Sequence, residues 1–371
     1  MKSKVYFMGL SNMGKGNNFV KKIEKLFEGS GAGEILSEGD LTAIKLHFGE
    51  PGNTAYIHPT FVRKIVDKVK EKDASPFLTD SNTLYFGGRD NSVNHLNSAI
   101  KNGFAYAVVD APLIIADGLR GKNTVKIKIN KKHFEDVLIA GEINQADSMV
   151  VLSHVKGHDL AGFGGAIKNI AMGCASAAGK QQQHSTTKPV IESYCIGCNK
   201  CTKWCPVNAI TVEEKQANID YIKCIGCGEC IAMCPVNAIK PQWSTDENSF
   251  QERMVEYAYG AVADKMKNDK VVFMNFVINV TPNCDCKAWS DAPIVPDVGI
   301  LVSKDPVAID RASCDLINQQ AGNENTLLTS NHEKGKDKFA GVQDRNIDIN
   351  IQFDYGKEIG LGNTDYELIR L

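Results

Sequence analysis

The sequence has no hydrophobic run long enough to cross a membrane. Its longest nearly apolar stretch covers only residues 271–280, whereas a membrane-spanning helix needs about 20 apolar residues. The first residues also lack the apolar segment and the small-residue cleavage site of a secretory leader. We therefore expect a cytoplasmic protein that does not contact a membrane.

An excess of charge of either sign is also missing. The chain of 371 residues has 42 Lys and Arg against 44 Asp and Glu, which gives a net charge of −2. Proteins that bind nucleic acid through bulk charge present a basic surface, so we expect no nucleic-acid partner. The sequence contains neither the Gly-x-Gly-x-x-Gly fingerprint of dinucleotide-binding enzymes nor a Ser/His/Asp nucleophile pattern.

Strand-like and helix-like patterns alternate through most of the chain, before residue 186 and again after residue 244. The predicted strands include residues 5–10, 41–48, 148–154, 271–280 and 299–302, and the predicted helices include 17–27, 59–71, 251–267 and 306–319. This alternation predicts an α/β host domain with a mostly parallel sheet, made of residues 1–185 and 245–371.

Cysteine is the residue that the sequence has in unusual number. Eight of the 12 cysteines lie between Cys195 and Cys234, inside an internal duplication. The segment CIGCNKCTKWCPVNAI, which begins at Cys195, matches CIGCGECIAMCPVNAI, which begins at Cys224. We predict a small α+β module at 186–244, with repeats 186–215 and 215–244, that interrupts the host domain after a polar linker at 175–188.

Each repeat has the spacing C-x2-C-x2-C-x3-C-P. This spacing resembles that of the bacterial two-cluster ferredoxins, in which the fourth cysteine of each run binds the other cluster. We therefore predict two [4Fe–4S] clusters, the first held by Cys195, Cys198, Cys201 and Cys234, and the second by Cys224, Cys227, Cys230 and Cys205. A zinc ribbon is the alternative, but its cysteine pairs are separated by longer gaps.

A second candidate site follows the predicted strand at 148–154, where a Gly-rich loop leads into a helix that begins near Ala166. Ligands of open α/β sheets bind beyond the carboxyl ends of strands, and the amides of a helix N-terminus favour an anion. The candidate catalytic residues are His158, Lys168 and His154, and the candidate cofactor-binding residues are Lys156, Gly162, Gly164 and Gly165. The alternative is a tight turn with solvent-facing polar side chains.

Polar residues follow other predicted strands as well. His47, Asp80 and Arg89 lie in two of these loops, and we add them to the same candidate site. Cys284 and Cys286 come directly after the predicted strand at 271–280. As thiolates this pair could bind a soft metal or take part in redox chemistry, and the alternative is two small loop residues.

The α/β halves, the Gly-rich loop and the inserted module together resemble the iron–sulfur proteins of the family called domain of unknown function 362. This resemblance covers most of the chain and implies a fold but no established reaction. More narrowly, His158-x3-Gly162-Phe163-x-Gly165 followed by Lys168 is similar to a loop of the nickel-pincer lactate racemases. That similarity implies a nickel ligand at His158 and a cofactor-tethering Lys168, although Ala166 and Ile167 replace a more polar run.

These features predict an iron–sulfur redox protein whose two clusters relay electrons to or from a cleft in the host domain, which would make it an oxidoreductase. Three alternatives stay open: a plain ferredoxin-like electron carrier, an iron–sulfur sensor, and a metal-dependent isomerase related to the nickel-pincer racemases. The expected partner is a redox protein or a small-molecule substrate. The cleft could hold an additional metal or an organic cofactor.

Overall fold

The computed structural model describes residues 2–11, 17–84, 87–184, 189–205, 207–224, 229–240, 247–343 and 347–371. None of the helices in these ranges is long and apolar enough to cross a bilayer.

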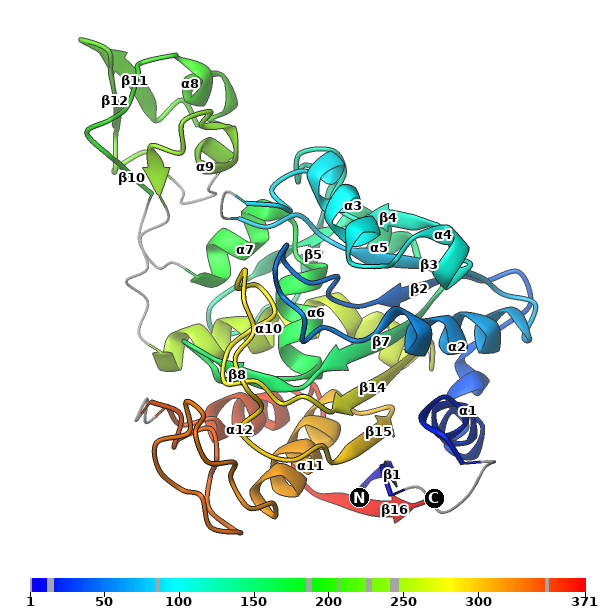
Figure 1. Ribbon diagram of the computed structural model, residues 1–371. Coiled ribbons are helices and arrows are strands. Elements are labelled where there is room, and N and C mark those ends of the chain that lie inside the picture. Colours follow the sequence, from blue (N-terminus) through cyan, green and yellow to red (C-terminus); the bar gives the residue numbers. More distant parts are fainter. Residues whose placement is uncertain are drawn as a thin grey trace.

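The host domain is built on a sheet in which eight described strands have the order β16-β1-β15-β14-β7-β2-β3-β4 (Figure 1). These strands are β1 (Ser3–Gly9), β2 (Leu41–Lys45), β3 (Ser75–Asp80), β4 (Leu113–Ile115), β7 (Ser148–His154), β14 (Val271–Val277), β15 (Gly299–Ser303) and β16 (Tyr366–Arg370). All neighbouring strands from β14 to β4 are parallel, as are β1 and β16, whereas β15 is antiparallel to both of its neighbours. The prediction of a mostly parallel sheet is confirmed.

Helices pack on both faces of this sheet. One face is covered by α1 (Phe19–Gly29), α2 (Pro59–Lys70), α3 (Ser92–Lys101) and α4 (Tyr106–Val109), and the other by α6 (Ala166–Cys174), α10 (Glu247–Lys267), α11 (Pro306–Asn318) and α12 (Asn350–Glu358). Shorter elements complete the host domain: η1 (Ala32–Ile35), β5 (Thr124–Lys128), β6 (Asp136–Ala140), α5 (Gly141–Gln145), β8 (Lys156–His158), β9 (Gly162–Gly164) and α7 (Ala177–His184).

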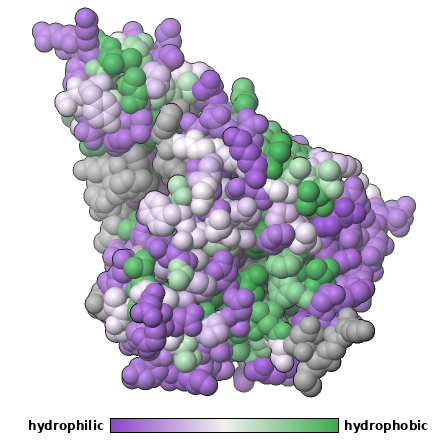
Figure 2. Space-filling view, viewed as in Figure 1, coloured by the Kyte–Doolittle hydropathy of each residue, from purple (hydrophilic) through white to green (hydrophobic). Residues whose placement is uncertain are grey.

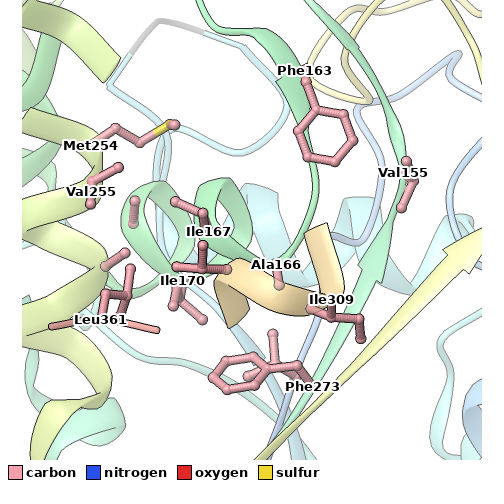
Figure 3. Packing of buried hydrophobic residues seen from close by; sticks show 14 of the residues in the cluster. Val155, Phe163, Ala166, Ile167, Ile170, Met254, Val255, Phe273, Ile309 and Leu361 are labelled. Carbon is pink, nitrogen blue, oxygen red and sulfur yellow. The ribbon is translucent and has the colours of Figure 1, made fainter. Parts of the chain in front are cut away.

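The position of strand β7 in the sheet explains why its sequence is apolar almost throughout. Its residues are all buried, with Met149 and Val151 in the core under α6 and α10, and Val150 and Leu152 in the core under α1 and α2. A parallel strand covered on both faces needs apolar side chains in both directions. Figure 3 shows the core on the first of these faces, where the side chains of α6 and α10 pack together.

The prediction of a polar linker at residues 175–188 is wrong over most of its length. Ala177–His184 forms helix α7, in which Lys180, Gln181 and Gln183 are buried. Ala and Gln favour helices. The side-chain amide of Gln183 donates a hydrogen bond to the Ala171 carbonyl of α6 (3.1 Å), so hydrogen bonds, rather than an apolar face, hold α7 against the host domain. Residues 185–188 lie outside the described part.

The cysteine-rich segment projects from the host domain (Figures 1 and 2). Its elements are β10 (Val190–Ile191), α8 (Lys200–Trp204), β11 (Ile210–Glu213), β12 (Gln216–Ile219), α9 (Glu229–Met233) and β13 (Ile239–Lys240), with β10 paired to β13 and β11 to β12. Helices α8 and α9 begin at the residue before the third cysteine of each repeat, so the duplication in sequence is also one in structure. The predicted boundaries at 186 and 244 fall outside the described ranges.

Candidate functional site

The loops that follow the parallel strands meet at one edge of the sheet. The loop after β2 reaches the loop after β14, where the Glu50 amide donates to the Asp285 carbonyl (3.1 Å). The loop after β7 reaches it too, since the Gly157 amide donates to the Thr281 carbonyl (2.8 Å). The carboxyl ends of neighbouring parallel strands lie side by side, and this geometry brings most of the predicted polar residues together.

Lys168 and the two cysteines after β14 form one contact. The Lys168 Nζ lies 2.8 Å from the Cys284 Sγ, and both residues are buried. A hydrogen bond from the Cys286 thiol, opposed by burial and aided by the charges of Lys168 and Lys156, holds the pKa of Cys284 well below its ordinary value. The same hydrogen bond raises the pKa of Cys286. These contacts favour the charged form of Cys284 beside the Lys168 ammonium and the neutral form of Cys286.

His154 holds the neighbouring Asp285. Its Nδ1 lies 2.9 Å from the Asp285 Oδ1, and its Nε2 lies 3.1 Å from the Ile278 carbonyl and 3.0 Å from the Asn279 carbonyl. All of these partners are acceptors, so both ring nitrogens must donate and the ring carries a positive charge. Burial opposes ionisation of Asp285, but the charges of His154 and Lys156 keep its pKa well below the ordinary value. His154 thus fixes the loop that carries the cysteines.

Asp80 is the centre of a second group of buried charges. Its Oδ1 lies 3.0 Å from the Lys45 Nζ, and its Oδ2 lies 3.5 Å from Arg89, which also binds Glu50 at 2.8 Å. Burial would raise the pKa of Asp80, but these cations lower it. Gly173 of α6 makes room for the pair, because a Cβ there would lie 2.1 Å from the Lys45 Nζ.

His47 lies between the two groups as a neutral ring. Burial, together with repulsion from Arg89, Lys156 and Lys168, lowers its pKa well below the ordinary value. Its Nδ1 accepts a hydrogen bond from the Gly49 amide (3.0 Å). The proton of the neutral ring is therefore on Nε2.

His158 occupies different surroundings from Lys168. Its Nδ1 accepts hydrogen bonds from the amides of Leu160 (3.2 Å) and Ala161 (3.1 Å), and its ring stacks on Phe250. These contacts stabilise the turn between β8 and β9. The two residues of the racemase similarity thus have different partners, since the Lys168 Nζ faces Cys284 and the His158 Nδ1 caps a hairpin. The nickel ligand at His158 stays a prediction.

The expectation that the N-terminus of α6 would bind a ligand anion is wrong. Asp310 of α11 accepts hydrogen bonds there from the amides of Ala166 (2.7 Å) and Ile167 (2.9 Å). Burial raises the pKa of this carboxyl to about 6, so it is largely ionised at neutral pH. The chain itself supplies the anion that the helix favours.

The three glycines of the loop serve packing. Gly162 has φ +64° at the hairpin turn, and a Cβ on Gly164 would lie 2.9 Å from the Lys168 Cδ. On Gly165 a Cβ would lie 2.3 Å from the Asp310 Oδ1. These positions allow the loop to pass close to charged side chains.

Four residues of this edge were not predicted: Lys45, Lys180, Asp285 and Asp310. Lys45 ends a buried strand, and Lys180 belongs to the segment that we expected to be a linker. Burial lowers the pKa of Lys180 to about 8. Asp285 had a usable signal, because it stands between the two cysteines that were singled out.

The cysteines of the projecting segment line a second candidate site. Cys195, Cys198, Cys201 and Cys234, the four predicted ligands of the first cluster, border one cavity. The amides of Ala209 and Ala238 each donate to the cysteine four residues earlier, Cys205 and Cys234, at 3.1 Å. Cys227, a predicted ligand of the second cluster, lies outside the described residues.

Within the described ranges, no group of three or more His, Cys, Asp or Glu side chains could hold a metal ion. The two [4Fe–4S] clusters therefore stay a prediction. Within the described residues, no disulfide joins any of the cysteines. Cys174 and Cys314 lie in the apolar core.

Comparisons with known proteins identify a family and a solved structure to which the chain is similar. No curated protein matches the chain. Among solved structures, it is similar to the lactate racemase apoprotein from Thermoanaerobacterium thermosaccharolyticum, with 12% identity and a TM-score of 0.35, over 74% of this chain and 50% of that one. The chain thus spans about half the length of that protein. The model of the family described as Domain of unknown function (DUF362) matches residues 42–315, and the chain belongs to this family.

Proposed function

We propose that the protein is an iron–sulfur redox protein that exchanges electrons between two [4Fe–4S] clusters and the charged edge of the host sheet. The observation that carries the proposal is the cavity bordered by Cys195, Cys198, Cys201 and Cys234, which come from both repeats. When bound, the clusters would supply transfer of single electrons. The described cysteines form no disulfide, which agrees with a reducing compartment.

The backbone around these cysteines suits a cluster. The Gly197 amide points at the Cys195 Sγ (3.5 Å), and Gly197 has φ +60°, with no room for a Cβ beside Lys215. Amide donors to the sulfurs stabilise the negative charge that a cluster carries and tune its potential. The equivalent bonds of Ala209 and Ala238 support this arrangement in both repeats.

The segment touches the host domain near the charged edge. Leu84, from the loop after β3, packs into the small core that includes Cys201, Cys230 and Ile231. Lys122 of the host domain lies over the ring of Trp204, with its Nζ 3.2 Å from the centroid. These contacts support electron exchange within one chain, with a redox protein as the external donor or acceptor.

An anionic small molecule is the substrate that this edge favours. The side chains that carry positive charge there outnumber those that carry negative charge by one; the former are Lys45, Arg89, His154, Lys156, Lys168 and Lys180, and the latter are Glu50, Asp80, Cys284, Asp285 and Asp310. Buried charge without a partner is costly. A carboxylate or phosphate group would balance the excess.

Elemental analysis of anaerobically purified protein tests the proposal. We expect about eight iron and eight sulfide per chain, since two four-iron clusters are proposed. Cys201→Ser should lower the iron content by about half, whereas Cys314→Ser, which changes a core cysteine, should leave it unchanged. Stoichiometric zinc without iron would reject the proposal, and nickel without iron would favour the isomerase alternative.

A further inference from the structure

Cys284 and Cys286 share surroundings that differ from those of the core cysteines. Cys284 is 3% exposed, yet its sulfur faces the Lys168 Nζ at 2.8 Å and the Cys286 amide at 3.5 Å. The side chain of Cys286 also forms a hydrogen bond with that sulfur. Cys174 and Cys314, in contrast, lie among apolar residues. The two sulfurs after β14 are therefore in contact with each other and with a cation.

The charges around the pair disfavour a metal ion. Lys168 contacts the sulfur itself, and Lys156 lies 3.6 Å from Asp285, the residue between the two cysteines. A metal cation at these sulfurs would be repelled by both ammonium groups. The same groups would stabilise a thiolate, which is the form that breaks and makes disulfides.

A continuous series of contacts joins the cysteine-rich segment to this pair. Leu84 packs against Cys201 and Cys230, and the next described step is the hydrogen bond from the Thr83 amide to the Arg89 carbonyl (2.9 Å). Arg89 binds Glu50 at 2.8 Å, and the Glu50 amide donates to the Asp285 carbonyl at 3.1 Å. The segment and the cysteine pair are thus linked through packed protein.

We propose that Cys284 and Cys286 form a redox-active dithiol that converts two single electrons into one two-electron step. The inference rests on the proposed function, because the two clusters supply the electrons. In reduction, the bond between the two sulfurs breaks as the pair accepts two electrons, one from each reduced cluster, and one proton. Cys286 takes the proton, and Cys284 stays as a thiolate against Lys168. The reverse step forms the disulfide and returns both electrons and the proton.

The energetics of such a disulfide agree with this direction. Two cysteines separated by one residue close a small ring, and strained disulfides have more oxidising potentials than structural ones. Clusters of the bacterial ferredoxin type reach low potentials. Electrons would therefore flow from the clusters to the disulfide.

Anaerobic redox titration of the full-length, cluster-loaded protein tests the inference. The protein is first oxidised with diamide and then titrated with reduced methyl viologen, a one-electron donor. Wild type should take up about two electrons per chain more than Cys286→Ser, because a disulfide is a two-electron couple. Cys284→Ser should behave like Cys286→Ser, and Cys314→Ser should behave like wild type.

Mass spectrometry locates the bond. Trypsin releases residues 271–287 as one peptide, which contains Cys284 and Cys286 and no other cysteine. After diamide this peptide should be lighter than the dithiol form by two hydrogens and should resist alkylation, and after titration both cysteines should be alkylated.

Two failures are distinguishable. Equal electron uptake by wild type and Cys286→Ser, together with alkylation of both cysteines after diamide, would overturn the dithiol. If the clusters still take up electrons in that case, the proposed function stays intact. Wild-type protein that binds no iron would overturn the proposed function, and the inference with it, because the pair would have no electron source.

Discussion

Single buried charges at the sheet edge are each held by more than one partner. Arg89 illustrates this, because it is almost fully buried between Glu50 and Asp80. A buried ion pair adds little to the free energy of unfolding compared with apolar packing of the same size. Removing one partner, however, leaves the other charge buried and uncompensated, which is strongly destabilising. Loss of an ion-pair partner should therefore cost more stability at a buried position than at an exposed one.

Arg89→Met should therefore lower the free energy of unfolding by about 3 kcal/mol. Arg63→Met is the matched control, because Arg63 is 40% exposed and pairs with Asp67 at the surface, and it should cost less than about 1 kcal/mol. Urea unfolding of both variants measures the difference. Similar losses in the two variants would show that Arg89 is not held as a buried ion pair.

Asp117 gives a prediction for pH. Its Oδ1 accepts two hydrogen bonds from Asn82, both at 2.9 Å, and burial raises its pKa from 3.8 to about 7. The folded state binds this proton more tightly than the unfolded chain. The stabilisation is therefore complete below a pH of about 4 and is lost as the pH rises through about 7.

Asp117→Asn keeps the accepting oxygen and removes the titration. Between the two pKa values, wild type should lose up to about 1.4 kcal/mol of stability per pH unit relative to the variant. Urea midpoints of both proteins from about pH 5 to about pH 8 test this. Parallel pH curves would mean that Asp117 titrates normally in the folded protein.

Most residues of the charged edge could be predicted from the sequence, but several of their partners could not. His154, Lys156, Lys168 and Cys284 could be predicted because they directly follow strands or a Gly-rich loop. Asp310 could not be related to Ala166, since nothing in the sequence links a helix N-terminus to a carboxylate on a helix far along the chain. The partner of a buried charge depends on packing between distant segments, which residue type and spacing do not report.

At this edge of the sheet, the backbone of β8 lies in close contact with the backbone of the loop after β14. Gly157 of β8 lies so close to the loop after β14 that a Cβ there would be 2.2 Å from the Pro282 carbonyl oxygen. That loop carries the cysteine pair. Glycine at this position thus sets the distance between the two loops.

Gly157→Ala should displace the loop after β14 and lower the free energy of unfolding by about 1–3 kcal/mol, as overpacking does. Gly9→Ala is the control, because its Cβ would meet only ordinary contacts at 3.7 Å. Thermal midpoints report stability, and the alkylation rate of Cys284 reports loop position. An unchanged alkylation rate in Gly157→Ala would contradict the predicted displacement.

Elements with an apolar pattern were predicted well and those without one were not. The strand at 148–154 agrees with β7 at both ends, and the helix at 59–71 agrees with α2 to within one residue. Helix α7 was missed because its buried side chains are mostly small or polar. Periodicity detects burial by apolar residues and gives no sign of burial by hydrogen bonding.

The whole molecule is a three-layer host domain with a projecting segment, and among the described residues Leu84 and Lys122 of the host domain contact that segment. Leu84 is the host residue in the segment's small core. The proposed electron exchange depends on this contact. The duplicated cysteine spacing predicted the segment, but only the structure shows which host loop it touches.

Leu84→Asp should weaken the contact, because a carboxylate would be buried without a partner. The radius of gyration in small-angle scattering should rise, and electron transfer to the Cys284–Cys286 pair should slow by about tenfold or more, the effect of about 1.4 kcal/mol on a rate. Leu119→Asp, at a host residue that is 63% exposed, should change neither. A normal transfer rate in Leu84→Asp would place the electron route elsewhere.

Strands β7 and β14 pair in parallel at the middle of the sheet, with Met149 opposite Val271, although residues 155–270 separate them in the chain. A ribosome that adds about 5–20 residues per second needs many seconds to make that stretch. During synthesis, the cysteine-rich segment therefore leaves the ribosome before β14 is available, while β7 can already pair with β2 on its other side. Assembly of the proposed clusters and completion of the host sheet then fall in one time window.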